Sequence, residues 1–212
     1  MNTDELIASL AGQARGPRRS PGLWLGGLTL AAVLVAAGLL IATIGVRPDI
    51  AAALGTWRFD YKFVVTTALA ASALILVRAS LYPEGSKRLP LWILLAAPAL
   101  VLIGVGAELL SIPAGAYAMS AVGKNGLVCL TVIPLLGIVP LGLVLWALRH
   151  GAPTRPGLAG VFAGLLAGGI AATFYAANCT DDSPFFVALW YPLAIAMLAI
   201  LGGIAGRWVI RW

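Results

Sequence analysis

The sequence predicts an all-α membrane protein in which six transmembrane helices form one bundle and both termini lie in the cytoplasm. Three observations support this fold. Of the 212 residues, 61% are hydrophobic and 10% are charged, which is too apolar a composition for a soluble domain of this size. Six stretches are long enough to cross the ~30 Å hydrocarbon core of a bilayer, which takes roughly 17–25 apolar residues in a helix. Lysine and arginine are also unevenly distributed between the connections.

Residues 1–22 are expected to form a cytoplasmic tail that begins with a short amphipathic helix over 3–11. Thr3 suits the N-cap position, and two acidic residues follow it in the first turn, where they favour a helix. A helix of about nine residues is not stable alone. The segment is therefore either a frayed tail or a helix that lays its apolar stripe in the groove of a partner. The residues expected to contact such a partner are Asp4, Glu5, Leu6, Ile7 and Leu10.

The first three spans are expected at about 23–46, 63–81 and 89–107. The first contains no charged residue, the second contains only Arg78 near its end, and the third is bounded by Arg88 and Glu108. Residues 50–62 are expected to form a loop before the second span. Aromatic and charged residues alternate at the end of this loop, a pattern that fits an aromatic belt at the membrane surface as well as a binding surface.

The last three spans are expected at about 127–148, 157–177 and 185–206, and residues 207–212 form a short cytoplasmic tail. Pro134 and Pro140 each remove a backbone hydrogen bond from the fourth span, which predicts kinks there. Three glycines spaced four residues apart, from Gly160 to Gly168, lie along one face of the fifth span. Such a face allows another helix backbone to approach closely.

Cytoplasmic connections of membrane proteins carry an excess of lysine and arginine, and this rule sets the orientation. With the N-terminus inside, ten of the 14 basic residues fall on the inner side and four on the outer side. The inner ones are Arg15, Arg18, Arg19, Arg78, Lys87, Arg88, Arg149, Arg155, Arg207 and Arg211. The outer ones are Arg47, Arg58, Lys62 and Lys124. Because these residues are scattered over the connections rather than gathered on one face, we expect no direct binding of nucleic acid.

The chain has two cysteines, and the six-span topology places both at the outer boundary of the membrane. Cys129 lies in the first turn of the fourth span, and Cys179 lies just beyond the fifth. In a bacterium this side is the periplasm, which is kept oxidising. The two thiols could form a permanent or reversible disulfide. They could instead capture a soft metal ion or react with an oxidant, or they could be two unrelated small apolar residues.

Two acidic residues, Asp181 and Asp182, follow the second cysteine directly. Their carboxylates could complete the coordination shell of a transient soft metal ion held by Cys129 and Cys179. We favour the alternative that they mark the start of the sixth span, where acidic residues stabilise a helix N-terminus. His150 follows Cys129 by about 21 residues, or ~32 Å along a helix, so it lies at the opposite face and cannot join this site.

The motifs of several enzyme classes are absent from the sequence. It contains no Cys-x-x-Cys pair, no Gly-x-Ser-x-Gly nucleophile elbow and no His-Glu-x-x-His metalloprotease motif. The central parts of the spans contain no charged residues, whereas ion-coupled transport usually depends on them. We therefore expect neither an enzyme nor an ion-driven pump, and no resident cofactor.

Short segments in order along nearly the whole chain resemble the NrsF family of bacterial anti-sigma factors. These segments include 3–7 with 10–11, 47–49, 81–85, 156–160 and 164–168, then Tyr175-Ala176, Trp190-Tyr191 and 210–212, with Phe59, Lys62, Cys129, Pro134, Pro140 and Cys179 between them. The family consists of six-helix inner-membrane proteins that hold an extracytoplasmic-function sigma factor inactive. One departure is Pro83-Glu84-Gly85, where the family usually has Pro-Gly.

The resemblance implies that Cys129 and Cys179 sense heavy-metal or oxidative stress in the periplasm and that a sigma factor is released from the cytoplasmic face. We expect the N-terminal helix to bind this partner. A small-molecule transporter or channel subunit is the alternative function. A structural membrane protein with a permanent disulfide is a third.

Overall fold

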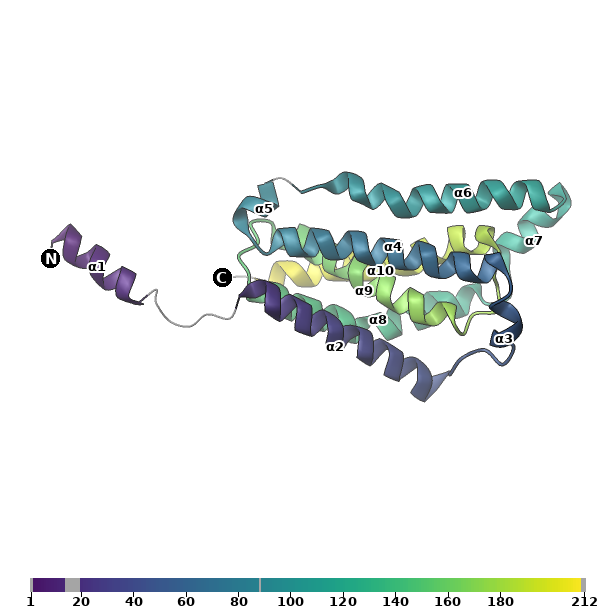
Figure 1. The fold of residues 1–212 in the computed structure, drawn as a ribbon, viewed down its shortest axis with the longest axis horizontal. Coiled ribbons are helices and arrows are strands. Elements are labelled where there is room, and N and C mark those ends of the chain that lie inside the picture. Colours follow the sequence, from purple (N-terminus) through teal and green to yellow (C-terminus); the bar gives the residue numbers. More distant parts are fainter. Residues whose placement is uncertain (1, 14–19, 88, 211–212) are drawn as a thin grey trace.

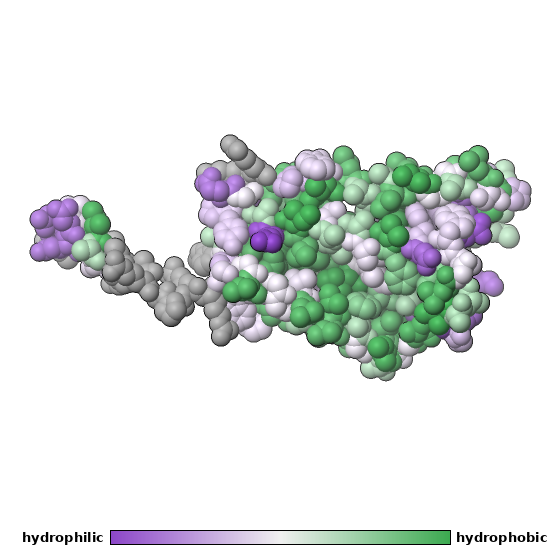
Figure 2. Space-filling view, in the orientation of Figure 1, coloured by the Kyte–Doolittle hydropathy of each residue, from purple (hydrophilic) through white to green (hydrophobic). Residues whose placement is uncertain are grey.

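A computed structural model describes residues 2–13, 20–87 and 89–210. Across these residues the protein is helical and has no β-strand, and it contains six helices long and apolar enough to cross a membrane. Figure 1 shows these helices side by side in one bundle. Figure 2 shows apolar side chains over most of the visible long side of the bundle, with hydrophilic residues gathered toward its two ends. The predicted six-helix all-α fold is confirmed.

The candidate spans contain the long helices and the short ones attached to them. A short helix, α1 (Thr3–Gln13), precedes the spans and lies apart from the bundle (Figure 1). The spans are α2 (Pro21–Thr43), α4 (Trp57–Ser80), η1 (Leu91–Leu95) with α6 (Ala96–Ser111), η2 (Ala114–Ala116) with α7 (Tyr117–Val122) and α8 (Gly126–Arg149), α9 (Pro156–Ala176) and α10 (Pro184–Val209). Two further short helices, α3 (Ile50–Ala53) and α5 (Pro83–Lys87), lie in the connections on either side of α4.

The centre of the bundle is α9, which packs against α10, α4, α8 and α2. The glycines that the sequence places on one face of α9 all face α10. A side chain at Gly160 would overlap the carbonyl oxygen of Gly202, and one at Gly164 would overlap the carbonyl oxygen of Leu198. The two helix backbones are therefore in direct contact, as the spacing predicts. The helix α8 runs continuously through Pro134 and Pro140.

Two helices include charged residues that we expected to lie in connections or at span boundaries. The helix α4 begins at Trp57, so residues 57–62 are helical rather than part of a loop, and Lys62 is buried. The helix α6 continues to Ser111 and includes Glu108, which is also buried. Each of these buried charges has a partner of opposite sign, because Lys62 pairs with Asp182 and Glu108 pairs with Arg58.

The helix termini of the spans fall at two opposite ends of the bundle. The start of α2 and the end of α10 lie at the same end (Figure 1). The start of α8, which carries Cys129, and the end of α9, which Cys179 follows, lie at the opposite end. Which end faces the cytoplasm remains a prediction from the distribution of lysine and arginine.

Candidate functional site

The two cysteines meet in the interior of the bundle end. Cys129 lies in the first turn of α8, and Cys179 lies in the connection from α9 to α10. Both are free thiols, both are buried, and both belong to an apolar cluster with Tyr175 and Tyr191. The thiols hydrogen bond to each other, and the Cys179 thiol also lies 3.8 Å from the carbonyl oxygen of Asp181. The expected placement at one end therefore brings the two sulfurs into contact.

The surroundings of Cys179 favour its thiolate. The hydrogen bond from Cys129 and the nearby ammonium group of Lys62 outweigh the opposing effect of burial and lower the pKa of Cys179 to about 7. The thiolate, rather than the thiol, is the nucleophile and the metal ligand. At neutral pH a larger share of this cysteine is therefore in the thiolate form than for a cysteine with an ordinary pKa.

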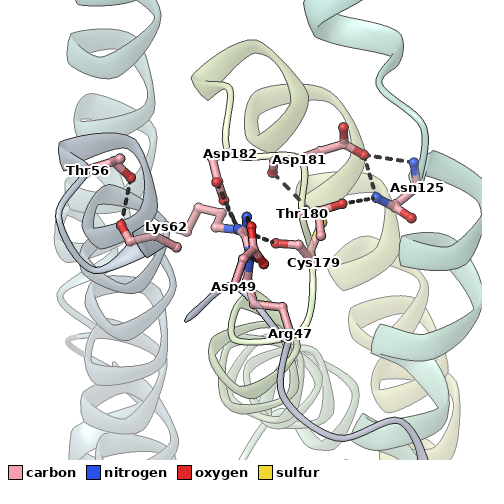
Figure 3. A network of polar contacts seen from close by, with 10 residues as sticks. Arg47, Asp49, Thr56, Lys62, Asn125, Cys179, Thr180, Asp181 and Asp182 are labelled. Atoms are coloured by element: carbon pink, nitrogen blue, oxygen red, sulfur yellow. Dashed lines mark hydrogen bonds and ion pairs between the residues drawn. The ribbon is translucent and has the colours of Figure 1, made fainter. Parts of the chain in front are cut away.

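The main-chain carbonyl of Cys179 is held by a buried lysine from α4. The Lys62 Nζ donates to this oxygen at 2.8 Å and forms an ion pair with the Asp182 carboxylate at 2.6 Å. No part of Lys62 is exposed. Figure 3 shows its side chain reaching from the first turns of α4 into the connection that carries Cys179. This single cation therefore joins α4 to the residue that carries a reactive thiol.

A second cation, Arg47, forms hydrogen bonds to the same connection and lies in the segment between α2 and α3. Its Nη1 donates to both carboxylate oxygens of Asp182 at 3.0 and 2.9 Å and to the Cys179 carbonyl at 3.3 Å. Its Nε and Nη2 each lie 2.7 Å from Asp49. The hydrogen bonds to Asp49, and then those to Asp182, raise the pKa of Arg47, and the same contact lowers the pKa of Asp49. Both cations also lie over the ring of Phe59.

The next residue of the connection, Asp181, is tied to the helix that carries the other cysteine. Its carboxylate accepts hydrogen bonds from the main-chain N–H groups of Lys124 and Asn125 at 3.0 and 2.8 Å, and from the Asn125 side chain at 2.8 Å. The carbonyl oxygen of Asn125 in turn accepts the N–H of Cys129 at 2.8 Å. A short path of hydrogen bonds thus connects the main chain beside each thiol. Figure 3 shows the part of this path between Asp181 and Asn125.

The connection is also joined to α6 through Glu108. One oxygen of its buried carboxylate accepts a hydrogen bond from Arg58 of α4 at 2.9 Å, and the other accepts one from Ser183 at 3.2 Å. Residues 179–183 consequently contact α4, α6, the start of α8 and the segment after α2. Any change in the bonding of Cys179 therefore occurs where hydrogen bonds and ion pairs join these elements.

The two carboxylates beside Cys179 do not complete a metal site in this arrangement. Asp181 is bound by N–H groups at the start of α8, and Asp182 is bound by Lys62 and Arg47, while Ser183 occupies the N-cap position of α10. Within 2–13, 20–87 and 89–210, no three or more histidine, cysteine or acidic side chains are grouped as metal ligands usually are. A soft metal ion bound by Cys129 and Cys179 alone stays a prediction.

The expected partner-binding residues lie on α1, away from the cysteines (Figure 1). Asp4 and Glu5 occupy its first turn. Leu6 and Ile7 are 41% and 58% exposed, so this helix presents apolar side chains to its surroundings. Leu10 is also in α1, but its side chain lies outside the described part of the structure.

Comparison with known proteins places these features in a family. Residues 10–212 match the family model NrsF, described as "Negative regulator of sigma F". The chain belongs to the NrsF family. It is 38% identical to the "Anti-sigma-F factor NrsF" of Caulobacter vibrioides and 34% identical to the "Probable anti-sigma-F factor NrsF" of Azospira oryzae, and each alignment covers all of both chains. No solved structure matches the chain.

The resemblance expected from the residues is therefore confirmed. Members of the NrsF family are named as negative regulators of a sigma factor, so the chain belongs to a family of regulatory proteins rather than of enzymes.

Proposed function

We propose that this protein is an inner-membrane anti-sigma factor that holds an extracytoplasmic-function sigma factor at the cytoplasmic face. It releases this partner when Cys129 and Cys179, at the periplasmic face, sense heavy-metal or oxidative stress. Support for the regulatory part comes from the family and from the names of two full-length relatives. The excess of basic residues at the end where α2 begins supports the orientation.

The observation that carries the sensing part is the contact between two free, buried thiols, one with a lowered pKa. An oxidant that accepts two electrons would convert them to a disulfide, and the thiols would lose two protons and two electrons in that step. A thiophilic metal ion would instead replace the two protons and bind both sulfurs. Either event changes the bonding at residues 179–183, which join four parts of the bundle.

The partner-binding part rests on α1. This helix has an acidic first turn and exposed apolar side chains, and it stands apart from the bundle near the end opposite the cysteines (Figure 1). An amphipathic helix of this kind binds by laying its apolar side in a groove. Asp4, Glu5, Leu6, Ile7 and Leu10 are the residues proposed to contact the sigma factor.

The switch requires two arrangements of the bundle with different affinities for the sigma factor. We assign the change to α8 and α9, with Pro134 and Pro140 absorbing a bend in α8. A stimulus must favour one arrangement by about 10⁴-fold to invert a population of 1:99. A covalent bond or a bound metal ion between two sulfurs is strong enough to supply such a preference.

Replacing the cysteines one at a time tests the sensing role. The variants Cys129→Ser and Cys179→Ser should keep the target genes repressed but should abolish their induction by cadmium or by the thiol oxidant diamide, measured with a reporter gene. Thr131→Ser is the matched control, because Thr131 lies on α8 and bonds only to the main chain of its own helix. A normal response in both cysteine variants would remove the sensing role while leaving the family assignment intact.

A further inference from the structure

The buried ammonium group of Lys62 depends on two partners in the connection that carries Cys179. Its ammonium group has no exposure, and its polar contacts are the Cys179 carbonyl at 2.8 Å and the Asp182 carboxylate at 2.6 Å. A buried ammonium group that loses such partners is left with an unpaired charge, which is strongly unfavourable. If Cys179 moves, the least costly response is that Lys62 and the start of α4 move with it.

The helix that carries Lys62 reaches both ends of the bundle. The 24 residues of α4 span ~36 Å at 1.5 Å per residue. Along its middle it packs against α9, where Thr173 donates a hydrogen bond to Thr66 at 2.9 Å. A side chain at Gly169 would lie only 3.0 Å from Ala70. A displacement of α4 at the cysteine end is therefore transmitted along a closely packed helix rather than absorbed beside the site.

At its far end α4 is fastened to the connection between α8 and α9. The carbonyl of Leu81, which follows the last helical residue, accepts the N–H of Ala152 at 2.8 Å. The neighbouring Gly151 fits so closely that a side chain there would lie 2.8 Å from the same oxygen. This contact stands at the end of the bundle from which α1 extends (Figure 1).

We propose that Lys62 is the positioning residue that fastens Cys179 to α4, so that α4 carries the state of the cysteine pair to the Leu81–Ala152 contact at the opposite end. This inference rests on the proposed function, and it adds the path by which a change at the cysteines reaches the opposite end of the bundle. Arg47 bonds to the same carbonyl and carboxylate, but it lies on the short segment between α2 and α3. Arg47 therefore holds the connection in place, whereas Lys62 connects it to an element that reaches the far end.

Hydrogen–deuterium exchange of the full-length protein in lipid nanodiscs tests this route. Diamide oxidises the two thiols to a disulfide and takes up their two electrons and two protons. In the wild type, oxidation should weaken the Leu81–Ala152 hydrogen bond and raise exchange in residues 150–153 roughly tenfold, as a shift in a local opening equilibrium does. Lys62→Met, treated with diamide until mass spectrometry shows that the disulfide has formed completely, should show no rise, and Lys62→Arg should restore it.

Thr67→Ser is the matched control, because Thr67 lies on the same part of α4 and its exposed hydroxyl bonds to the main chain of its own helix rather than to the cysteine connection. It should respond to diamide as the wild type does. If oxidised Lys62→Met shows the same rise as the wild type, the proposal is overturned and the change travels through α8 or α9. Unchanged exchange in both 60–66 and 150–153 of the oxidised wild type also overturns it, whether or not the Lys62 variant folds. A sensing failure is seen separately, because the cysteine variants in the reporter assay do not involve Lys62.

Discussion

Two neighbours give the Cys179 thiol its unusual acidity, and each comes from a different helix. Cys129 of α8 donates a hydrogen bond, and Lys62 of α4 contributes positive charge. Burial acts in the opposite direction because it disfavours the thiolate. The acidity therefore depends on the assembled bundle and would be lost in the unfolded chain.

The rate of Cys179 alkylation should follow this pKa. Because the pKa is lowered from 9.0 to about 7, the thiolate is present above pH 7 and is lost as the pH falls below it. The rate of modification by iodoacetamide in detergent, followed by mass spectrometry, should rise with a midpoint near pH 7. Cys129→Ala removes the hydrogen bond and should move the midpoint toward 9. Thr131→Ser should leave it unchanged, and a wild-type midpoint near 9 would contradict this account.

The cysteine pair could be predicted from the sequence, but the cations that hold it could not. The position of each cysteine relative to an apolar span determines the end at which it lies, so counting spans is sufficient. The sequence places Lys62 in a loop, because a lysine usually marks the end of a membrane span. A signal was nevertheless present: Phe59, Lys62 and Thr66 are spaced as one face of a helix, and all three are buried.

At the scale of elements, α9 and α10 pack against each other more extensively than any other pair of helices in the described structure. Their backbones meet at Gly160, Gly164 and Gly202 without intervening side chains. The glycine spacing on α9 predicted a close approach, but one sequence cannot identify the helix on the other side. The matching glycines of α10 become informative only when the two helices are seen to be antiparallel neighbours joined by residues 177–183.

Adding one methyl group to this contact should destabilise the protein. A side chain at Gly164 would overlap the Leu198 carbonyl oxygen, and such overpacking typically costs about 1–3 kcal/mol. Gly164→Ala should therefore lower the midpoint of thermal unfolding in detergent. Gly142→Ala is the matched control on α8, because its added methyl group would meet open space, and it should be neutral or slightly stabilising. Equal unfolding midpoints for Gly164→Ala and the wild type would mean that the helices can separate at little cost.

At the scale of the whole molecule, charged residues inside the bundle gather at the cysteine end. Lys62, Glu108 and Arg47 are all buried there, and each is paired. Charges within membrane proteins are costly and usually mark a functional site. The opposite end has α1, with exposed apolar side chains and an acidic first turn. The molecule is thus divided into an end rich in internal bonds and an end with a free amphipathic helix.

This division predicts which function is lost when α1 is removed. Without residues 1–11 the bundle and the cysteine pair should remain intact, because the described contacts of the site involve none of these residues. The truncated protein should reach the membrane and form the Cys129–Cys179 disulfide with diamide as the wild type does. It should fail to retain a sigma factor in pull-downs from membranes, and the target genes should be constitutively expressed.

The double variant Leu6→Ser and Ile7→Ser should show the same loss, since both side chains are exposed on α1. Ala8→Ser is the matched control on the same helix. Repression that persists after truncation would place the sigma-binding surface on the bundle itself.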